Sequence, residues 1–122
     1  MTFDQHIGMK HRDEFSAQID TEDHHLNPTG NINGGVLISL ADNLATGVAS
    51  ACWREKTGEQ AFLVGVDLHA VMLTNQLGGT IIAKAEPVRV GRRIVVIRTV
   101  ITGRDERVLA EITTTHVPVQ NS

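Results

Sequence analysis

The chain has 122 residues, a formal net charge of −3 and a hydrophobic fraction of 41%, which supports one domain with a modest core. Its single cysteine excludes an internal disulfide bond and favours a reducing compartment. A pI near 6.0 and the small aromatic fraction argue against a nucleic-acid-binding protein. Because the N-terminus lacks the apolar core of a signal peptide and no run looks long or apolar enough to span a bilayer, we expect a cytoplasmic protein without membrane contact.

No repeat, low-complexity tract or linker divides the chain, so residues 1–122 are expected to form one domain, with 1–10 an uncertain N-terminal segment. Phe15, Ala17 and Ile19 alternate with polar neighbours and predict a first strand that ends in the acidic stretch 20–23. The segment 27–35, with sequence NPTGNINGG, is rich in turn-forming residues and leads into an apolar stretch.

A helix is predicted over residues 35–52, within a stretch from Gly34 to Trp53 whose only charge is Asp42. Small polar groups form one narrow stripe on it: Ser39, Asp42, Asn43, Thr46 and Ser50. Apolar residues cover the remainder: Val36, Leu37, Leu40, Ala41, Leu44, Ala45, Val48 and Cys52. A surface helix normally carries charges on its wet side, so this helix is expected to be buried on most sides. A lone carboxylate there is costly unless the protein uses it.

Four strands are predicted after the helix, over residues 61–73, 80–90, 92–102 and 106–117. In the first, one face carries Phe62, Val64, Val66, Leu68 and Met72. In the second strand, one face carries Ile81, Ala83 and Ala85. In the fourth, one face carries Val108, Ala110 and Ile112. In the third, Val95, Ile97 and Ile101 lie opposite Ile94, Val96 and Val100. The predicted class is α+β, with one apolar helix lying across a curved antiparallel sheet whose last four strands form a meander.

The strand at 92–102 is apolar on both faces, and a small domain has nothing to cover the second face. The open edges of such a sheet also need a partner. We therefore expect a homo-oligomer, either a homodimer or a homotetramer.

Basic residues are concentrated after residue 83, where seven basic side chains accompany four acidic ones. Arg92 and Arg93 adjoin Gly91 in a predicted turn, which favours a phosphate-binding patch. The alternative is that these arginines belong to solvated strand faces and turns.

The pattern Asn27-x-x-Gly30-x-x-Asn33-Gly34-Gly35, followed by Leu40-Ala41-Asp42-Asn43 and Thr46, resembles hotdog-fold acyl-CoA thioesterases. The branch it resembles is the phenylacetate-degradation (PaaI-type) branch of the 4-hydroxybenzoyl-CoA thioesterase superfamily, over most of the chain from Phe15 to Val117. The resemblance implies a hotdog fold, with one long buried helix wrapped by a curved antiparallel sheet. The family usually has His where this chain has Asn33.

The resemblance also implies roles for individual residues. Asp42 would attack the thioester or activate a water that does, and the Gly34 N–H would bind the carbonyl oxygen. Asn27 would orient the water or the carboxylate, and Thr46 would hydrogen-bond nearby. Family sites lie across a dimer interface, where the carboxylate of one subunit faces the Gly-Gly loop of the other.

Several of these residues keep a second interpretation. Asp42 is alternatively a structural carboxylate paired with an arginine across an interface, and Gly34 and Gly35 alternatively serve tight packing of the helix against the sheet. Asn33 is either a helix N-cap or a substrate contact, and Thr46 either serves the site or bonds back to its own helical turn. The expected substrate contacts are Gly35, Val66, Arg89, Arg92 and Arg93.

The sequence implies no cofactor and no metal, because the six histidines show no ligand spacing with Cys52 or a carboxylate. Cys52 lacks a nucleophile motif and is expected to pack in the core. The predicted function is hydrolysis of a small or medium acyl- or aryl-CoA to the free acid and CoA. The alternatives are a hotdog protein that binds acyl-CoA without hydrolysing it, a hotdog thioester dehydratase, which the absence of His at position 33 disfavours, and a structural subunit of a larger complex.

Overall fold

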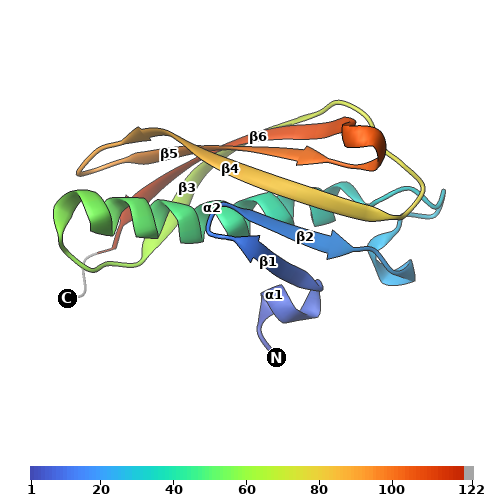
Figure 1. The fold of residues 1–122 in the computed structure, drawn as a ribbon, viewed down its shortest axis with the longest axis horizontal. Coiled ribbons are helices and arrows are strands. Elements are labelled where there is room, and N and C mark those ends of the chain that lie inside the picture. Colours follow the sequence, from blue (N-terminus) through green and yellow to red (C-terminus); the bar gives the residue numbers. More distant parts are fainter. Residues whose placement is uncertain (120–122) are drawn as a thin grey trace.

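The computed structural model describes residues 1–119, and its central element is the long helix α2 (Gly34–Thr57). One antiparallel sheet contains six strands: β1 (Met9–Asp13), β2 (Ser16–Asp20), β3 (Leu63–Met72), β4 (Thr80–Val90), β5 (Val95–Thr102) and β6 (Val108–Pro118). The remaining elements are the short helix α1 (Phe3–His6) and two 3₁₀ helices, Asp23–His25 and Arg104–Glu106. The spatial order of the six strands in the sheet is β1-β2-β4-β5-β6-β3 (Figure 1).

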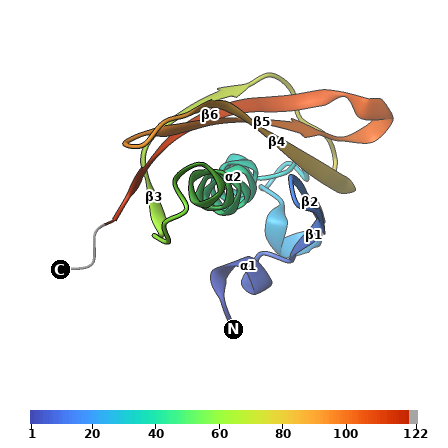
Figure 2. The same cartoon turned by 60° about the vertical axis from the view of Figure 1, so that its left-hand side comes forward.

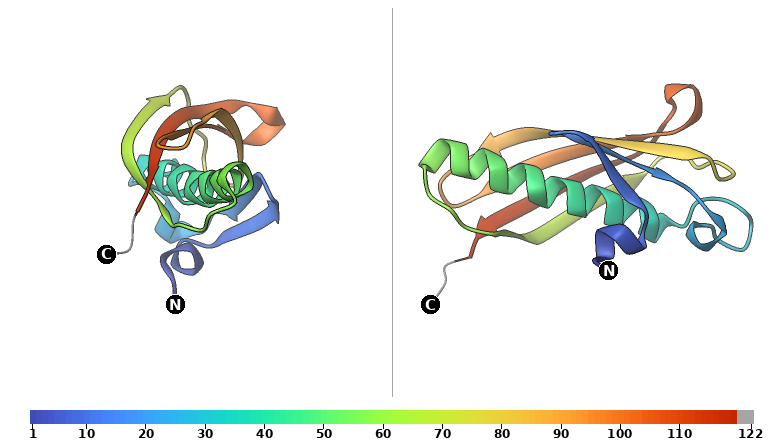
Figure 3. Two further views of the ribbon diagram at one scale, coloured as in Figure 1. Left: turned by 90° about the vertical axis from the view of Figure 1, so that its left-hand side faces the viewer. Right: turned by 60° about the horizontal axis from the view of Figure 1, so that its bottom comes forward.

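The sheet curves around α2, with β3 on one side of the helix and β1 and β2 on the other (Figure 2). The views along and below the helix show the same arrangement (Figure 3). This is the predicted α+β hotdog architecture, in which a curved antiparallel sheet wraps one long helix.

Helix α2 is longer than the predicted 35–52 because its ends are set by two identifiable caps. At the start, the Asn33 side chain accepts a hydrogen bond from the Gly35 N–H. At the end, Gly58 adopts the left-handed conformation, with φ +72°, and its N–H bonds to the Arg54 carbonyl. The cap at Gly58 therefore ends the helix five residues beyond the predicted end at residue 52.

The core lies between one face of α2 and the concave face of the sheet. The helix contributes Leu37, Leu40, Ala41, Leu44, Ala45, Val48, Ala49 and Trp53, all buried. The sheet contributes Ala17, Ile19, Ile81, Ala83, Ala85, Val95, Ile97, Ile101 and Ile112, among others, as the alternation in those strands predicted. Val36 and Cys52, expected in the apolar cover of the helix, are only partly buried.

The predicted four-strand meander is wrong, because β3 pairs with β6 and not with β4. The chain crosses from β3 at one edge of the sheet to β4 in its interior, and only β4, β5 and β6 follow one another as neighbours. A second difference lies in the uncertain N-terminal segment, where β1 pairs with β2 as the other edge strand. Local periodicity identifies strands but carries no information about which strands pair.

The predicted buried face of β3 is also wrong. Phe62 is 66% exposed and Val66 58% exposed, whereas Leu63 is fully buried. β3 is an edge strand, and a register shift between Gly65 and Asp67 interrupts its alternation. As a result, β3 presents apolar side chains to solvent.

Smaller differences occur at three other predicted strand residues. Phe15 and Val108 are exposed where burial was expected, and Ile94 precedes β5 in the turn from β4. The outer face of β5 is not simply apolar, since Arg98 pairs there with Glu86 and Glu111. Val96 and Val100 are half-buried on that face.

Within residues 1–119, α2 is the one helix whose length and composition would suffice to cross a membrane, so the expectation that no such run exists is wrong on those criteria. The sheet packs against this helix along its length (Figure 1). That packing accounts for the apolar composition of the helix.

Candidate active site

Asp42 lies on the face of α2 that the sheet leaves open, at a hollow of about 660 Å³. The hollow lies between the N-terminal elements and β3, and the helix lines it with its polar stripe, from Asp42 and Asn43 to Thr46 and Ser50. The polar stripe recognised in the sequence therefore faces a cavity and not bulk solvent alone.

A second hollow of about 290 Å³ meets the first at Asp42 and Gly65, which line both. A Cβ built on Gly65 would stand 3.4 Å from Oδ1 of Asp42. Because Gly65 carries no side chain, β3 passes over the carboxylate without covering it. The side chain of Asp42 makes no hydrogen bond to residues 1–119, so both carboxylate oxygens remain available.

His116 lies behind the same glycine, on the inner face of β6. It is fully buried, its Nε2 lies 2.7 Å from Oγ1 of Thr114, and its Nδ1 has no partner among the described residues. Burial lowers the pKa of His116 below its usual value, and the nearby charge of Asp42 opposes that change. His116 is one of the six histidines that show no ligand spacing in the sequence, although its place two residues after Thr114 sets both side chains on one face of β6.

Asn33 is the N-cap of α2, as one of its two interpretations predicted. Its Oδ1 accepts a hydrogen bond of 2.8 Å from the Gly35 N–H. The N–H of Gly34 donates to no atom of residues 1–119 and points from the start of the helix. A Cβ on Gly34 would meet the terminal methyl group of Met72 at 3.2 Å. Gly34 therefore offers an open backbone donor at the positive end of α2.

Asn27 stabilises the loop that leads into α2. Its Oδ1 accepts hydrogen bonds from the Thr29 N–H at 2.9 Å, the Thr29 hydroxyl at 2.6 Å and the Asn31 N–H at 3.2 Å. This oxygen is fully used within the loop, so only the amide nitrogen of Asn27 is left for the predicted role toward water or carboxylate.

Two further polar residues flank Asp42 on the helix. The hydroxyl of Thr46 donates to the backbone oxygen of Asp42 at 2.9 Å, which is the back-bonded arrangement predicted as its alternative. The Nδ2 of Asn43 is buried and has no partner in residues 1–119. Asn43 was not among the predicted site residues, although it belongs to the polar stripe.

A single chain does not bring Gly34 and Asp42 together. They are eight residues apart on one helix, which separates them by about 12 Å along its axis. One thioester carbonyl cannot contact both groups of the same chain.

The expected substrate contacts are spread over the surface. Gly35 and Val66 are exposed, at the start of α2 and on β3. Arg89 is exposed near the end of β4, and Arg92 and Arg93 lie in the following turn. None of the three arginines makes an ion pair with residues 1–119.

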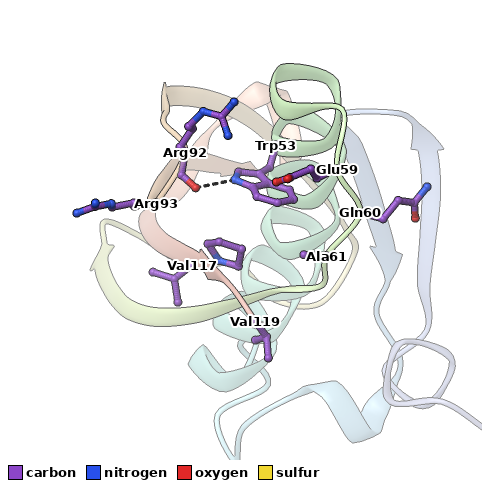
Figure 4. Close-up of a pocket in the computed structure, with 9 residues that line it drawn as sticks. Trp53, Glu59, Gln60, Ala61, Arg92, Arg93, Val117 and Val119 are labelled. Carbon is purple, nitrogen blue, oxygen red and sulfur yellow. Dashed lines mark hydrogen bonds between the residues drawn. The ribbon is translucent and has the colours of Figure 1, made fainter. Parts of the chain in front are cut away.

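The turn of Arg92 and Arg93 borders a hollow of about 790 Å³ at the far end of α2 (Figure 4). Trp53 stands between the helix and this turn, and its indole N–H donates to the Arg92 carbonyl oxygen at 2.8 Å. Trp53 lies about 16 Å from Asp42 along the helix axis. The basic turn is thus held at a fixed distance from the carboxylate.

Cys52, the residue considered and rejected as a nucleophile in the sequence, is half-buried on α2. Burial raises the pKa of its thiol, with smaller contributions in the same direction from Glu55 and Glu14. The thiol is therefore protonated at neutral pH, as a packing residue would be.

Comparison with known proteins adds three kinds of similarity. A family model described as the thioesterase superfamily matches residues 29–110. A Mycobacterium tuberculosis protein named "Putative esterase" is 30% identical over 112 residues, which cover 88% of this chain and 79% of that protein.

The solved structure of that M. tuberculosis protein superposes with a TM-score of 0.89 at 24% identity, covering 98% of each chain. The Escherichia coli PaaI protein of the phenylacetic acid degradation operon gives a TM-score of 0.84 at 17% identity, covering 98% of this chain and 85% of that one. A Streptococcus pneumoniae structure described as a thioesterase protein with coenzyme A gives 0.77 at 21%, covering 93% and 87%. These three structures share the fold of this chain.

Proposed function

The chain belongs to the thioesterase superfamily and is a thioester hydrolase; from that premise we propose that it hydrolyses small or medium acyl- or aryl-CoA to the free acid and CoA. The observation that carries the proposal is the Asp42 carboxylate, the only charge on the central stretch of α2, exposed to two hollows beneath Gly65. A carboxylate held there without an ion-pair partner in residues 1–119 is available to react.

Asp42 acts on the thioester carbonyl, either by taking a proton from a water as the water attacks or by attacking the carbon itself. In the first case the water oxygen bonds to the carbonyl carbon and its proton moves to Asp42. The carbon–sulfur bond then breaks, and the proton passes from Asp42 to the CoA thiolate. The Gly34 N–H stabilises the negative charge that develops on the carbonyl oxygen.

The site is completed by a second copy of the chain. Because Gly34 and Asp42 of one chain are about 12 Å apart along α2, the oxyanion donor must come from another subunit. The exposed apolar side chains of β3, including Val66, Leu68 and Met72, offer the edge through which two copies associate as a homodimer or as half of a homotetramer.

The CoA end of the substrate lies along the basic turn. Arg92 and Arg93, with Arg89 nearby, are exposed cations without ion pairs in the described part of the chain, at the opposite end of α2 from Gly34. The S. pneumoniae neighbour is described as a complex with coenzyme A, which supports the same ligand here. We place the protein in the cytoplasm, where its CoA ester substrates would be found.

The N-cap role of Asn33 supports hydrolysis over the alternative of an acyl-CoA-binding protein without catalysis. That alternative depended on Asn33 as a sign of lost activity. The Asn33 side chain is engaged with the Gly35 N–H, and neither the Gly34 N–H nor the Asp42 carboxylate depends on it.

The test is hydrolysis of a panel of acyl- and aryl-CoA esters, followed with a reagent for the released thiol, by the wild-type protein and by Asp42→Asn. The amide is isosteric but neither basic nor nucleophilic, so turnover should fall roughly 10²–10⁴-fold with no loss of thermal stability. Ser39→Ala, from the same polar stripe one turn earlier, is the matched control. If Asp42→Asn turns over like the wild type, the assignment of Asp42 is wrong.

A further inference from the structure

His116 is a buried titratable residue that the proposed mechanism does not use. It is fully buried on the inner face of β6, and the nearest strand positions in the register are Gly65 on β3 and Val95 on β5, neither of which carries a charge. From α2, the facing charged group is Asp42. The imidazole therefore has one ionisable neighbour, the proposed reacting carboxylate.

The geometry directs one edge of the imidazole toward the space above Asp42. A Cβ on Gly65 would lie 3.8 Å from both Cε1 and Nδ1 of His116 and 3.4 Å from Oδ1 of Asp42. Nδ1 and Oδ1 thus flank the same small space, which Gly65 leaves unfilled. Nδ1 has no other partner in residues 1–119.

The contact of the other ring nitrogen is compatible with a proton on Nδ1. Nε2 lies 2.7 Å from the hydroxyl oxygen of Thr114, which is fully buried and can donate its proton to an unprotonated Nε2. Burial keeps the imidazole neutral, with a single N–H. A proton on Nδ1 faces the carboxylate favourably, whereas an Nδ1 lone pair would face another negative group.

We propose that His116 carries its proton on Nδ1 and acts as a positioning residue for Asp42, orienting the carboxylate across the space that Gly65 leaves. His116 does not touch the substrate, and it acts through Asp42 alone. The inference rests on the proposed function of Asp42, but the position of the proton on the His116 ring can be measured without any turnover of substrate.

The first test is the tautomer of His116, observed by long-range ¹H–¹⁵N correlation on protein labelled with ¹⁵N-histidine, with the signal assigned by its loss in His116→Gln. We expect the proton on Nδ1 at pH 7 and a change in the His116 nitrogen shifts in Asp42→Asn but not in Ser39→Ala. A proton on Nε2, or shifts that ignore Asp42→Asn, would overturn the proposal.

The second test compares two amide substitutions. The side-chain nitrogen of Asn can occupy the place of Nδ1, and that of Gln the place of Nε2. We expect His116→Gln to lower kcat about tenfold, whereas His116→Asn retains most of it, with KM unchanged in both. His6→Gln, an exposed histidine on α1, is the control.

The outcomes separate the two proposals. If Asp42→Asn abolishes turnover while His116→Asn and His116→Gln lose activity equally, the role of Asp42 stands and that of Nδ1 fails. If the wild type hydrolyses no CoA ester, the proposed function fails, while the tautomer measurement still decides the geometry. A general loss of folding in both variants, seen by circular dichroism, would leave the tautomer in the wild type as the deciding result.

Discussion

The carboxylate of Asp42 lies directly beneath Gly65, and a Cβ on that glycine would stand 3.4 Å from Oδ1 of Asp42. The two residues come from α2 and from the edge strand β3, and both line the two hollows at the site. Gly65 therefore controls access to the carboxylate, which no sequence motif indicated.

The first prediction concerns that access. At 3.4 Å the methyl group of Gly65→Ala makes ordinary contact and no clash, so the variant should fold with nearly the wild-type thermal stability. It fills the space above Asp42, and we expect kcat to fall at least about tenfold because water and the carbonyl approach less closely. Inhibition by free CoA should be unchanged. Full activity of Gly65→Ala would show that the thioester reaches Asp42 by another route.

The second prediction concerns the start of α2. Gly34→Ala should lower kcat/KM more than Asn33→Ala, because its methyl group stands where the thioester approaches the N–H. In the structure this methyl group would also meet the end of the Met72 side chain at 3.2 Å. Met72→Ala removes that contact, but Met72 also lies on the proposed association edge, so the double variant is compared with Met72→Ala alone. Failure of the double variant to recover to the activity of Met72→Ala would assign the effect to the substrate.

The third prediction is that Asn33 acts as a helix cap. Asn33→Ala loses the bond to the Gly35 N–H and should destabilise the protein by about 1 kcal/mol, measured by chemical denaturation. Asn33→Ser and Asn33→Asp retain a capping oxygen and should restore stability. A loss of kcat/KM in Asn33→Ala without any loss of stability would instead identify Asn33 as a substrate contact.

The fourth prediction concerns the basic turn. Arg92→Ala with Arg93→Ala should raise KM for acyl-CoA more than it lowers kcat, and added salt should weaken binding by the wild type through screening. A truncated pantetheine or N-acetylcysteamine thioester lacks the nucleotide phosphates, so it should be hydrolysed equally by the wild type and the double variant.

The side chains of Arg92 and Arg93 are exposed in a turn, so the double variant should keep the oligomeric state of the wild type in a mass measurement. An equal loss on full and truncated substrates would exclude phosphate binding by this turn, and dissociation into monomers would place the pair in an interface.

The fifth prediction concerns stability in mild acid. Burial lowers the pKa of His116 in the folded protein, with the Asp42 charge acting in the opposite direction, whereas the unfolded chain protonates this residue near pH 6.5. Below pH 6.5 the unfolded state therefore binds more protons, and the free energy of unfolding falls, by at most about 1.4 kcal/mol per pH unit for one group. The fall stops below the folded-state pKa. Denaturation curves at several pH values should show a shallower decline for His116→Gln than for the wild type, and identical slopes would contradict the assignment.

Much of the architecture was predictable because it depends on local chemistry. The apolar face and polar stripe of α2 and the alternation in β4 and β5 each follow from residues close in sequence. Asp42 was identifiable for the same reason, since a single charge within an apolar helix is visible in the sequence alone. Asn33 left two interpretations, and the structure confirmed the cap.

The pairing of the strands was not predictable, because the β3–β6 ladder joins residues that lie between 38 and 55 positions apart in the sequence. The same long-range pairing made β3 an edge, so the alternation of Phe62, Val66 and Leu68, which predicted a buried face, produced an exposed apolar edge instead. Nothing in the periodicity of a strand specifies whether a neighbour will cover it.

The sequence by itself identified the candidate site residues and the elements they occupy, because side-chain type and periodicity are properties of a few neighbouring residues. Only the tertiary structure decided what surrounds Asp42, where Gly65 comes from one strand and His116 from another. These relationships arise when the sheet closes around the helix and brings distant segments within a few ångströms. Such contacts depend on the whole fold, and no local pattern contains them.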